Sequence, residues 1–330
     1  MFRRAILSLL LFASISIDGR GTRPANDTLR QALVAKHLPV EGAKLPNLDK
    51  NITSGAELDD TNQFVIAYYL DDGSGLLNPP IFLDRYDRKR EAWSSVALTE
   101  PKIRWSDVDI DCVGSILSIT AGGSRLFLDT HLNPSAGCLL VLTPDLKLEA
   151  GLYGWLLGRL GEDRLVYHRS QVHFAPVHPA ELAFFDLRTK RQVTLFPPKP
   201  EPPIWKARTL QLREFYRGNE EWCNKNNDPC QPEYFDSALQ GPVVTNETEA
   251  ALAFLISYKQ IQLVQGDVQK PSGPKDALYV YRRVDDEAKM EYREMLLDDA
   301  KARFGDVALQ NLLQPEILQK IFSEAPAKNP

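Results

Sequence analysis

Short apolar runs separated by turns are the feature that most restricts the fold of this chain. From about residue 63 onward, "QFVIAYYL" is followed by the turn cluster "DDGSG", and "SILSITA", "SRLFLDTH" and "ELAFFDLRTKRQVTLF" come later in the same style. Each run is rich in β-branched and aromatic residues and has turn signals on both sides, a pattern typical of β-strands. The sequence therefore predicts an all-β protein.

Four of these segments align with one another. They are "IFLDRYDRK" from Ile81, "LLVLTPDLK" from Leu139, "LAFFDLRTK" from Leu182 and "LYVYRRVDD" from Leu278. Each is an apolar run followed by a polar turn, and in the first three a lysine stands at the ninth position: Lys89, Lys147 and Lys190. A further apolar run precedes each unit: "FVIAYYL", "RLFLDTH", "RLVYHRS" and "AALAFLISYK". The starts are 58, 43 and 96 residues apart, and 96 is close to two intervals of 48.

A period in the forties made of about four short strands is typical of a propeller blade. The units "LAFFDLRTKRQVTLF" and "IFLDRYDRKREAW" resemble the outer hairpins of β-propeller blades, and this generic resemblance covers roughly residues 60 to 296. It implies a β-propeller of about five four-stranded blades over 61–296, with 197–245 as an aberrant blade or a large insertion. A β-sandwich with long loops is the alternative, because closely spaced hairpins fit that fold too.

The two ends of the chain differ from this texture. Residues 18–60 are polar, and we expect an N-terminal extension with one short helix at "TLRQALVAKHL". In the C-terminal segment 297–330, Ala300 and Phe304 continue a four-residue spacing from Leu296, and Ile317 and Ile321 repeat it beyond Pro315. This spacing predicts short helices, which we expect to pack on the edge of the propeller.

The first residues predict export. "MFRRAILSLLLFASISIDGRG" has two arginines, an apolar run from Ala5 to Ile17 and small residues near Ser16, as a cleaved signal peptide over 1–17 would. The run is too short for a comfortable membrane span of about 20 residues. An uncleaved signal anchor is the alternative. We therefore expect a secreted or periplasmic protein whose mature chain has no stable insertion in a membrane.

Four cysteines can form disulfides in an oxidising compartment. Cys223 and Cys230 lie in the polar stretch "EWCNKNNDPCQPEY", where a bridge would close a small loop. Cys112 and Cys138 would form the second pair if their strands are neighbours. The spacing is not C-x-x-C, so the sequence gives little support to a redox or zinc site.

Three histidines lie five residues apart: His168, His173 and His178. Five residues separate side chains on a strand and on a helix alike, so only the irregular segment "FAPVHP" would let them converge on a metal. We expect a solvent-facing loop, with a metal site as the alternative.

Three carboxylates share one face of the segment "SDVDIDC": Asp107, Asp109 and Asp111. Hard oxygen ligands in a row suit Ca²⁺, although no EF-hand loop is present. The alternative is an ordinary strand with a solvated outer face. We expect no other cofactor.

The 197–245 stretch gathers aromatic residues that would stack on sugar rings or anchor a protein partner. They are Trp205, Tyr216, Trp222, Tyr234 and Phe235. Equally, they would form the core of a distorted blade. N-x-T sequons stand at Asn26, Asn51 and Asn246, where glycosylation depends on the producing cell.

No motif commits the chain to chemistry, since phosphate loops and G-x-S-x-G are absent. A net charge of −5 without a basic stripe argues against nucleic acid as a partner. We expect an exported, monomeric, non-enzymatic protein that binds a protein or glycan. The alternative is a secreted polysaccharide-active hydrolase or lyase with a carboxylate pair at a central channel.

Overall fold

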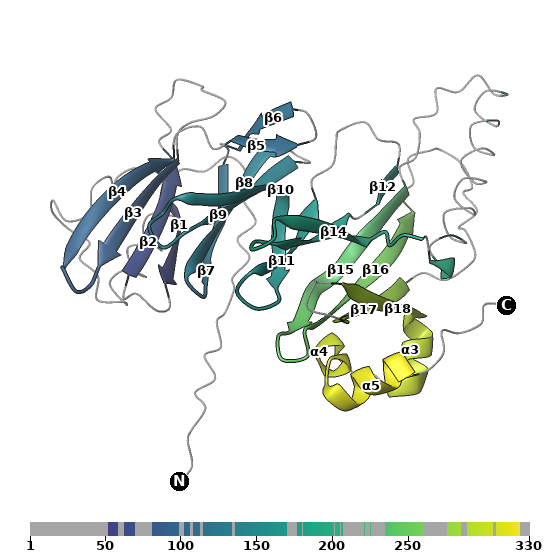
Figure 1. Cartoon of the computed structure of the whole chain (residues 1–330). Coiled ribbons are helices and arrows are strands. Elements are labelled where there is room, and N and C mark those ends of the chain that lie inside the picture. Colours follow the sequence, from purple (N-terminus) through teal and green to yellow (C-terminus); the bar gives the residue numbers. More distant parts are fainter. Residues whose placement is uncertain are drawn as a thin grey trace, which may run out of the picture.

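The structure is a computed structural model of the whole chain (Figure 1). It describes residues 52–58, 63–69, 81–98, 102–105, 108–112, 115–133, 136–169, 177–179, 181–200, 202–204, 206, 221, 225, 235–260, 276–284, 289–305 and 308–323. The signal-peptide segment 1–17, the short helix expected at 28–38 and the sequons at Asn26 and Asn51 lie outside these residues. The described part is mostly β, with several antiparallel sheets, as the sequence predicts.

Most strands belong to antiparallel meanders, in which each strand pairs with the next one along its sheet. Meander 1 consists of β1 (Ile52–Leu58), β2 (Gln63–Tyr69), β3 (Ile81–Asp87) and β4 (Ala92–Leu98). Meander 2 consists of β7 (Ser115–Gly122), β8 (Arg125–Asn133), β9 (Ala136–Leu142) and the first half of β10 (Leu148–Arg159). Meander 3 consists of the second half of β10, β11 (Arg164–Arg169), β13 (Leu182–Asp186) and β14 (Arg191–Phe196). Meander 4 consists of β15 (Phe235–Asn246), β16 (Ala251–Gln260), β17 (Asp276–Arg283) and β18 (Met290–Leu296).

Two short elements lie outside this pattern. The hairpin of β5 (Lys102–Trp105) and β6 (Val108–Asp111) connects meanders 1 and 2. The strand β12 (Val177–Pro179) pairs in parallel with the start of β15, so it adds to the sheet of meander 4.

The strand β10 links two meanders because it bends in the middle. Residues 148–153 pair with β9, and residues 154–159 pair with β11. Gly154 marks the change, with a φ of 154°, and a Cβ added there would lie 2.0 Å from the His168 carbonyl oxygen. Only glycine accommodates this backbone approach, and it lets one strand serve two sheets.

The four aligned sequence units are the third strands of their meanders: they begin at or within β3, β9, β13 and β17. The four preceding apolar runs are the second strands, β2, β8, β11 and β16. The self-similarity therefore reflects a repeated four-stranded unit, which resembles a propeller blade. The first strand of meander 1, β1, lies inside the segment that the sequence treats as an N-terminal extension.

Hydrophobic clusters join the meanders in chain order. Val65 and Leu83 of meander 1 pack with Leu128 of meander 2, and Phe127 of meander 2 packs with Tyr167 of meander 3. A third cluster joins meanders 3 and 4, as described below. Because alternate residues of a strand point to opposite faces, each inner sheet contributes one face to each neighbour. The described sheets form a row (Figure 1) and are not closed into a ring.

The C-terminal spacing correctly predicts helices, and these helices cover the far face of meander 4 (Figure 1). They are α3 (Leu297–Phe304), α4 (Leu309–Leu312) and α5 (Pro315–Ser323). Leu318 and Ile321 of α5 pack with Leu278 and Val280 of β17. None of the helices in the described part is long and apolar enough to cross a membrane.

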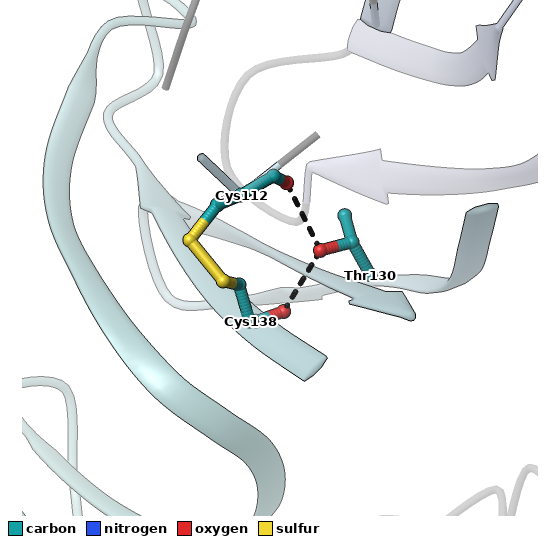
Figure 2. The surroundings of a disulfide bond; sticks show 3 residues. All are labelled: Cys112, Thr130 and Cys138. Carbon is teal, nitrogen blue, oxygen red and sulfur yellow. Dashed lines mark hydrogen bonds between the residues drawn. A yellow bond between two sulfur atoms is a disulfide. The ribbon is translucent and has the colours of Figure 1, made fainter. Parts of the chain in front are cut away.

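One disulfide fastens the β5–β6 hairpin to meander 2. Cys112, which follows β6, is bonded to Cys138 of β9, and both side chains are fully buried. The Thr130 hydroxyl lies 3.1 Å from the Cys112 carbonyl oxygen and 3.4 Å from that of Cys138, and it donates to them (Figure 2). The pairing expected for Cys112 and Cys138 is therefore confirmed, whereas Cys223 and Cys230 lie outside the described residues.

Candidate functional site

A hollow of 440 Å³ opens between meanders 3 and 4, and it is the best candidate for a ligand site. Three chain segments form its wall: the β10–β11 turn, the β15–β16 turn and the end of β17. The polar lining residues are Arg164, Glu247, Thr248 and Arg283, and Leu160 and Val284 add apolar surface. Its volume falls within the range of about 300–1,000 Å³ that small-molecule sites occupy.

The sheets hold these turns in fixed positions. Leu160 is buried in the cluster that joins the two meanders, where it packs with residues such as Phe196 and Phe254. Tyr281 of β17 donates its hydroxyl hydrogen to the carbonyl oxygen of Leu195 on β14, and burial raises the pKa of Tyr281 well above its usual value. The hollow therefore lies at the rim of a rigid interface and is walled by turns, as ligand sites often are.

Arg164 stands at the start of β11 on the meander 3 side of the hollow. Its Nε lies 3.7 Å from Oδ2 of Asp186, and only 18% of its side chain is exposed. Asp186 itself accepts a hydrogen bond of 2.7 Å from the backbone N–H of Thr189. Burial alone would raise the pKa of Asp186, but the hydrogen bonds from Thr189 and the nearby arginine charges outweigh it and lower the pKa.

The side chain of Asn246 anchors the β15–β16 turn to the C-terminal helices, α3 to α5, which we call the helical cap. Its Oδ1 accepts from the Glu249 backbone N–H at 3.2 Å, and its Nδ2 donates to the Leu313 carbonyl oxygen at 2.9 Å. The amide nitrogen of the Asn246 sequon is thus engaged in a partly buried contact. A glycan on this nitrogen would displace the link between α4 and α5.

The buried carboxylates of the described residues do not form a catalytic pair. Asp84 lies in meander 1, Asp129 in meander 2 and Asp186 in meander 3, and each hydrogen-bonds to its own neighbours. Burial raises the pKa of Asp84, although hydrogen bonds from Ser95 and Tyr68 oppose this. Two carboxylates about 5–9.5 Å apart across a cleft would be needed for glycoside hydrolysis.

Asp129 is the most perturbed of the three. Burial raises its pKa to about 6, while hydrogen bonds from the Leu156 backbone N–H and the Ser118 hydroxyl, both at 3.0 Å, oppose this. Leu156 follows the bend of β10 at Gly154. Asp129 therefore ties the strand that meanders 2 and 3 share, and sequence reasoning missed it because nothing in "RLFLDTH" marks its partner 27 residues away.

Two of the three histidines lie on strands of the described part. His168 lies on β11, its ring centroid is 5.6 Å from that of Trp155, and burial lowers its pKa. For His168 the expectation of a solvent-facing loop is wrong, because its imidazole lies on the sheet and packs against the Trp155 indole. His178 lies on the short strand β12, paired with Asp236, rather than in an irregular loop. His173 lies outside the described residues.

Most of the other predicted site residues fall in segments outside the described part of the chain. Trp205, Tyr216, Trp222, Tyr234 and Asp107 lie outside the described residues. Phe235 begins β15, and Asp109 and Asp111 lie two positions apart on β6, with Asp111 exposed and Cys112 buried beside it. Within the part of the chain that is described, no group of three or more His, Cys, Asp or Glu side chains could hold a metal ion.

These observations define a mostly β protein built of four-stranded antiparallel meanders, with a polar hollow between two of them. No protein-family model matches the chain, and no curated protein matches it. The chain is similar to solved structures at low identity. The hydrazine synthase of Kuenenia stuttgartiensis has a TM-score of 0.35 and 9% identity, over 75% of this chain and 54% of that one.

Two further solved structures come from Pyrococcus. The β-propeller domain of the Trilobed protease from Pyrococcus furiosus has a TM-score of 0.33 and 10% identity, over 76% of this chain and 58% of that one. The acylaminoacyl peptidase of Pyrococcus horikoshii has a TM-score of 0.24 and 9% identity, over 75% and 39%. This chain thus spans between 39% and 58% of the length of the three structures.

Proposed function

We propose that this chain is an exported, non-enzymatic binding protein and that a glycan enters the hollow between meanders 3 and 4. The observation that carries the proposal is the hollow itself, with Arg164, Glu247, Thr248 and Arg283 in its wall. A hydroxyl group both donates and accepts, guanidinium only donates, and an ionised carboxylate only accepts. A lining that contains all three kinds of group suits a ligand rich in hydroxyls.

The shape of the site favours a glycan over the alternative, a protein partner. Protein partners bury about 800 Å² on each side of a standard interface, usually around aromatic anchors. The hollow is instead a concave site of 440 Å³, within the size range of small-molecule sites. The aromatic residues expected to bind ligand, from Trp205 to Phe235, remain a separate candidate surface.

Export and the propeller architecture belong to the same proposal. A buried disulfide supports an oxidising compartment, either secreted or periplasmic, because cytosolic thiols are kept reduced. The four-stranded order and the consecutive packing of the meanders support propeller blades. Because meanders 3 and 4 already pack directly on each other, we infer that the segment between β14 and β15 is an insertion rather than a fifth blade between them.

A glycan array with the purified mature protein tests the proposal. Thr248→Trp places an indole in the mouth of the hollow, and Ser124→Trp places one on the exposed β7–β8 turn of meander 2 as the matched control. We expect binding to one class of glycan, at least about tenfold weaker for Thr248→Trp and unchanged for Ser124→Trp. Absence of any bound glycan, or equal binding by both variants, would reject the hollow as the site.

A second arm of the array addresses Ca²⁺. If Asp107, Asp109 and Asp111 bind this cation next to a ligand, EDTA removes binding and added Ca²⁺ restores it. Binding that is insensitive to EDTA would rule out a cation-assisted site. No observation among the described residues supports the alternative, a polysaccharide-active hydrolase or lyase.

A further inference from the structure

We infer that the glycan in this hollow is acidic: it carries a carboxylate, which Arg164 and Arg283 bind from opposite walls. The inference rests on the proposed function, because it names the chemical class of ligand for the same site. Sugar acids, such as uronic acids, combine one carboxylate with several hydroxyls on a single ring.

The first argument is the state of the Arg164 guanidinium. Its one charged neighbour, Asp186, lies 3.7 Å from Nε, which is longer than a hydrogen bond of about 2.7–3.2 Å. Asp186 itself accepts hydrogen bonds from Thr189, through both the backbone N–H and the side chain of that residue. Among the described residues, the Arg164 guanidinium donates no hydrogen bond. Its five N–H donors therefore have capacity for a ligand.

Arg125, at the start of β8 in meander 2, is a second arginine, and the hydrogen-bond donors of its guanidinium are occupied. Arg125 donates from Nε and Nη2 to Glu149 at 2.6 and 3.1 Å, and its Nη1 lies 3.0 Å from Asp163. Its side chain is 18% exposed, as is that of Arg164. The two side chains are equally exposed, but among the described residues only the Arg125 guanidinium donates hydrogen bonds to carboxylates. The Arg164 donors match the planar, two-oxygen geometry of a carboxylate.

The opposite wall completes the match to a sugar acid. Arg283, at the end of β17, also lines the hollow, from the meander 4 side. Its guanidinium would be the second cation for a carboxylate bound between the two meanders. Glu247 and Thr248 are exposed at the β15–β16 turn and accept hydrogen bonds from hydroxyls. An acidic peptide would offer Glu247 only backbone N–H groups, whereas a sugar acid offers several hydroxyls on the ring that carries the carboxylate. The lining therefore favours an acidic glycan over an acidic peptide.

Titration calorimetry on the full exported protein tests this inference. The probes are glycans that contain uronic or sialic acid, each compared with its counterpart in which the carboxyl is reduced to a primary alcohol, and a polyglutamate peptide. The variants are Arg164→Lys and Arg283→Gln, with Arg90→Gln as control because the Arg90 side chain is 85% exposed on meander 1. Thermal melting checks that each variant folds, and Arg283→Gln alone decides if Arg164→Lys does not.

We expect acidic glycans to bind at least about tenfold more tightly than their reduced counterparts, with this preference lost in both hollow variants and kept in Arg90→Gln. Equal binding of acidic and reduced forms overturns carboxylate recognition but leaves the proposed glycan site intact. Binding of polyglutamate alone overturns the glycan as the ligand class. Absence of binding by every probe, together with an empty glycan array, overturns both the inference and the proposed function.

Discussion

At the scale of single residues, a few buried polar groups and glycines decide how the sheets join. Asp129 is one of these residues, since its carboxylate reaches from β8 to the backbone of the shared strand β10. A carboxylate kept in this place destabilises the protein when it is charged, because burial disfavours the ionised form. This cost makes its contribution to stability dependent on pH.

We predict that Asp129→Asn stabilises the protein at pH 7 but has little effect near pH 4. An amide can accept from the Leu156 N–H and donate to the Ser118 hydroxyl, so both contacts are kept without the charge. The folded pKa of Asp129 is raised from 3.8 to about 6, so the folded state binds its proton more tightly than the unfolded state. Wild-type stability is therefore lost progressively as pH rises from 3.8 to about 6, by up to about 3 kcal/mol.

Urea unfolding of wild type and Asp129→Asn between pH 4 and 7 measures this difference. Asp145→Asn, a substitution at an exposed position in the β9–β10 turn, is the control, and we expect its effect to remain within about 0.5 kcal/mol. A gap between wild type and Asp129→Asn that does not widen with pH would contradict the prediction.

Gly154 gives a second prediction at the same scale. A methyl group there would meet the His168 carbonyl oxygen at 2.0 Å, and a backbone oxygen cannot move without breaking the sheet. We expect Gly154→Ala to lower the free energy of unfolding by about 3 kcal/mol. Gly241→Ala is the control, since its φ is 72° but no atom lies within 4 Å, and we expect about 1 kcal/mol from conformational strain alone. Equal effects in thermal melts of the two variants would show that the bend does not need glycine.

At the scale of elements, the sequence predicts the strands but not the register of the turns. Aligned runs from Ile81 and Leu182 mark the third strands correctly because alternating apolar residues report burial directly. Their turns begin at Asp87 and Asp186, which are the seventh and fifth residues of the aligned units. The alignment of Lys89 with Lys190 is therefore wrong by two positions, because β13 is two residues shorter than β3.

Three hairpin turns share a hydrogen-bond pattern that the sequence does not reveal. In each, a side-chain oxygen accepts the backbone N–H three residues on, and the next residue takes a left-handed φ. The first residues are Asp87, Asp186 and Asn246, and the left-handed residues are Glu91 (φ 49°), Lys190 (56°) and Ala250 (47°). None of the left-handed residues is glycine, so the usual turn signal is missing. The hollow was not predictable for the same reason, since the turn at 246–250 forms part of its wall.

The disulfide links elements that are separate in the sequence, which leads to a third prediction. Cys112 and Cys138 are 26 residues apart and enclose the β7–β8 hairpin. Restricting a loop of this length in the unfolded chain stabilises a protein by about 3.5 kcal/mol. We expect the double variant Cys112→Ala and Cys138→Ala to lose about this free energy of unfolding in urea.

The control is Leu117→Ala, at a position that is 47% exposed, which should change the free energy of unfolding little. A loss below about 1 kcal/mol would mean that the cross-link does not restrict the unfolded chain.

At the scale of the whole molecule, each sheet of the row needs a neighbour on each apolar face. Meander 2 has meanders 1 and 3, and meander 3 has meanders 2 and 4. Meander 4 ends the row, and its second face, with Ala253, Leu278 and Val280, is covered by the helical cap, α3 to α5. Terminal caps of this kind keep repeat proteins soluble, because they replace the next repeat with a polar outer surface. The cap was predictable from sequence through its helical spacing, whereas the face that it covers was not, because that depends on which meander comes last.

The cap leads to the last prediction, which concerns self-association. Ile321 is buried against meander 4, and Phe322 lies under the guanidinium groups of Arg282 and Arg293, 4.2 and 5.0 Å from its ring centre. We expect Ile321→Asp to detach the cap at a cost of at least about 3 kcal/mol, since it buries a charge without a partner.

The neighbouring substitution Lys320→Asp falls on an exposed position of α5 and should have no such effect. Light scattering after size exclusion should show a monomer for wild type and Lys320→Asp, and concentration-dependent association for Ile321→Asp through the uncovered sheet face. A folded, monomeric Ile321→Asp with an unchanged melting temperature would show that meander 4 is stable without its cap.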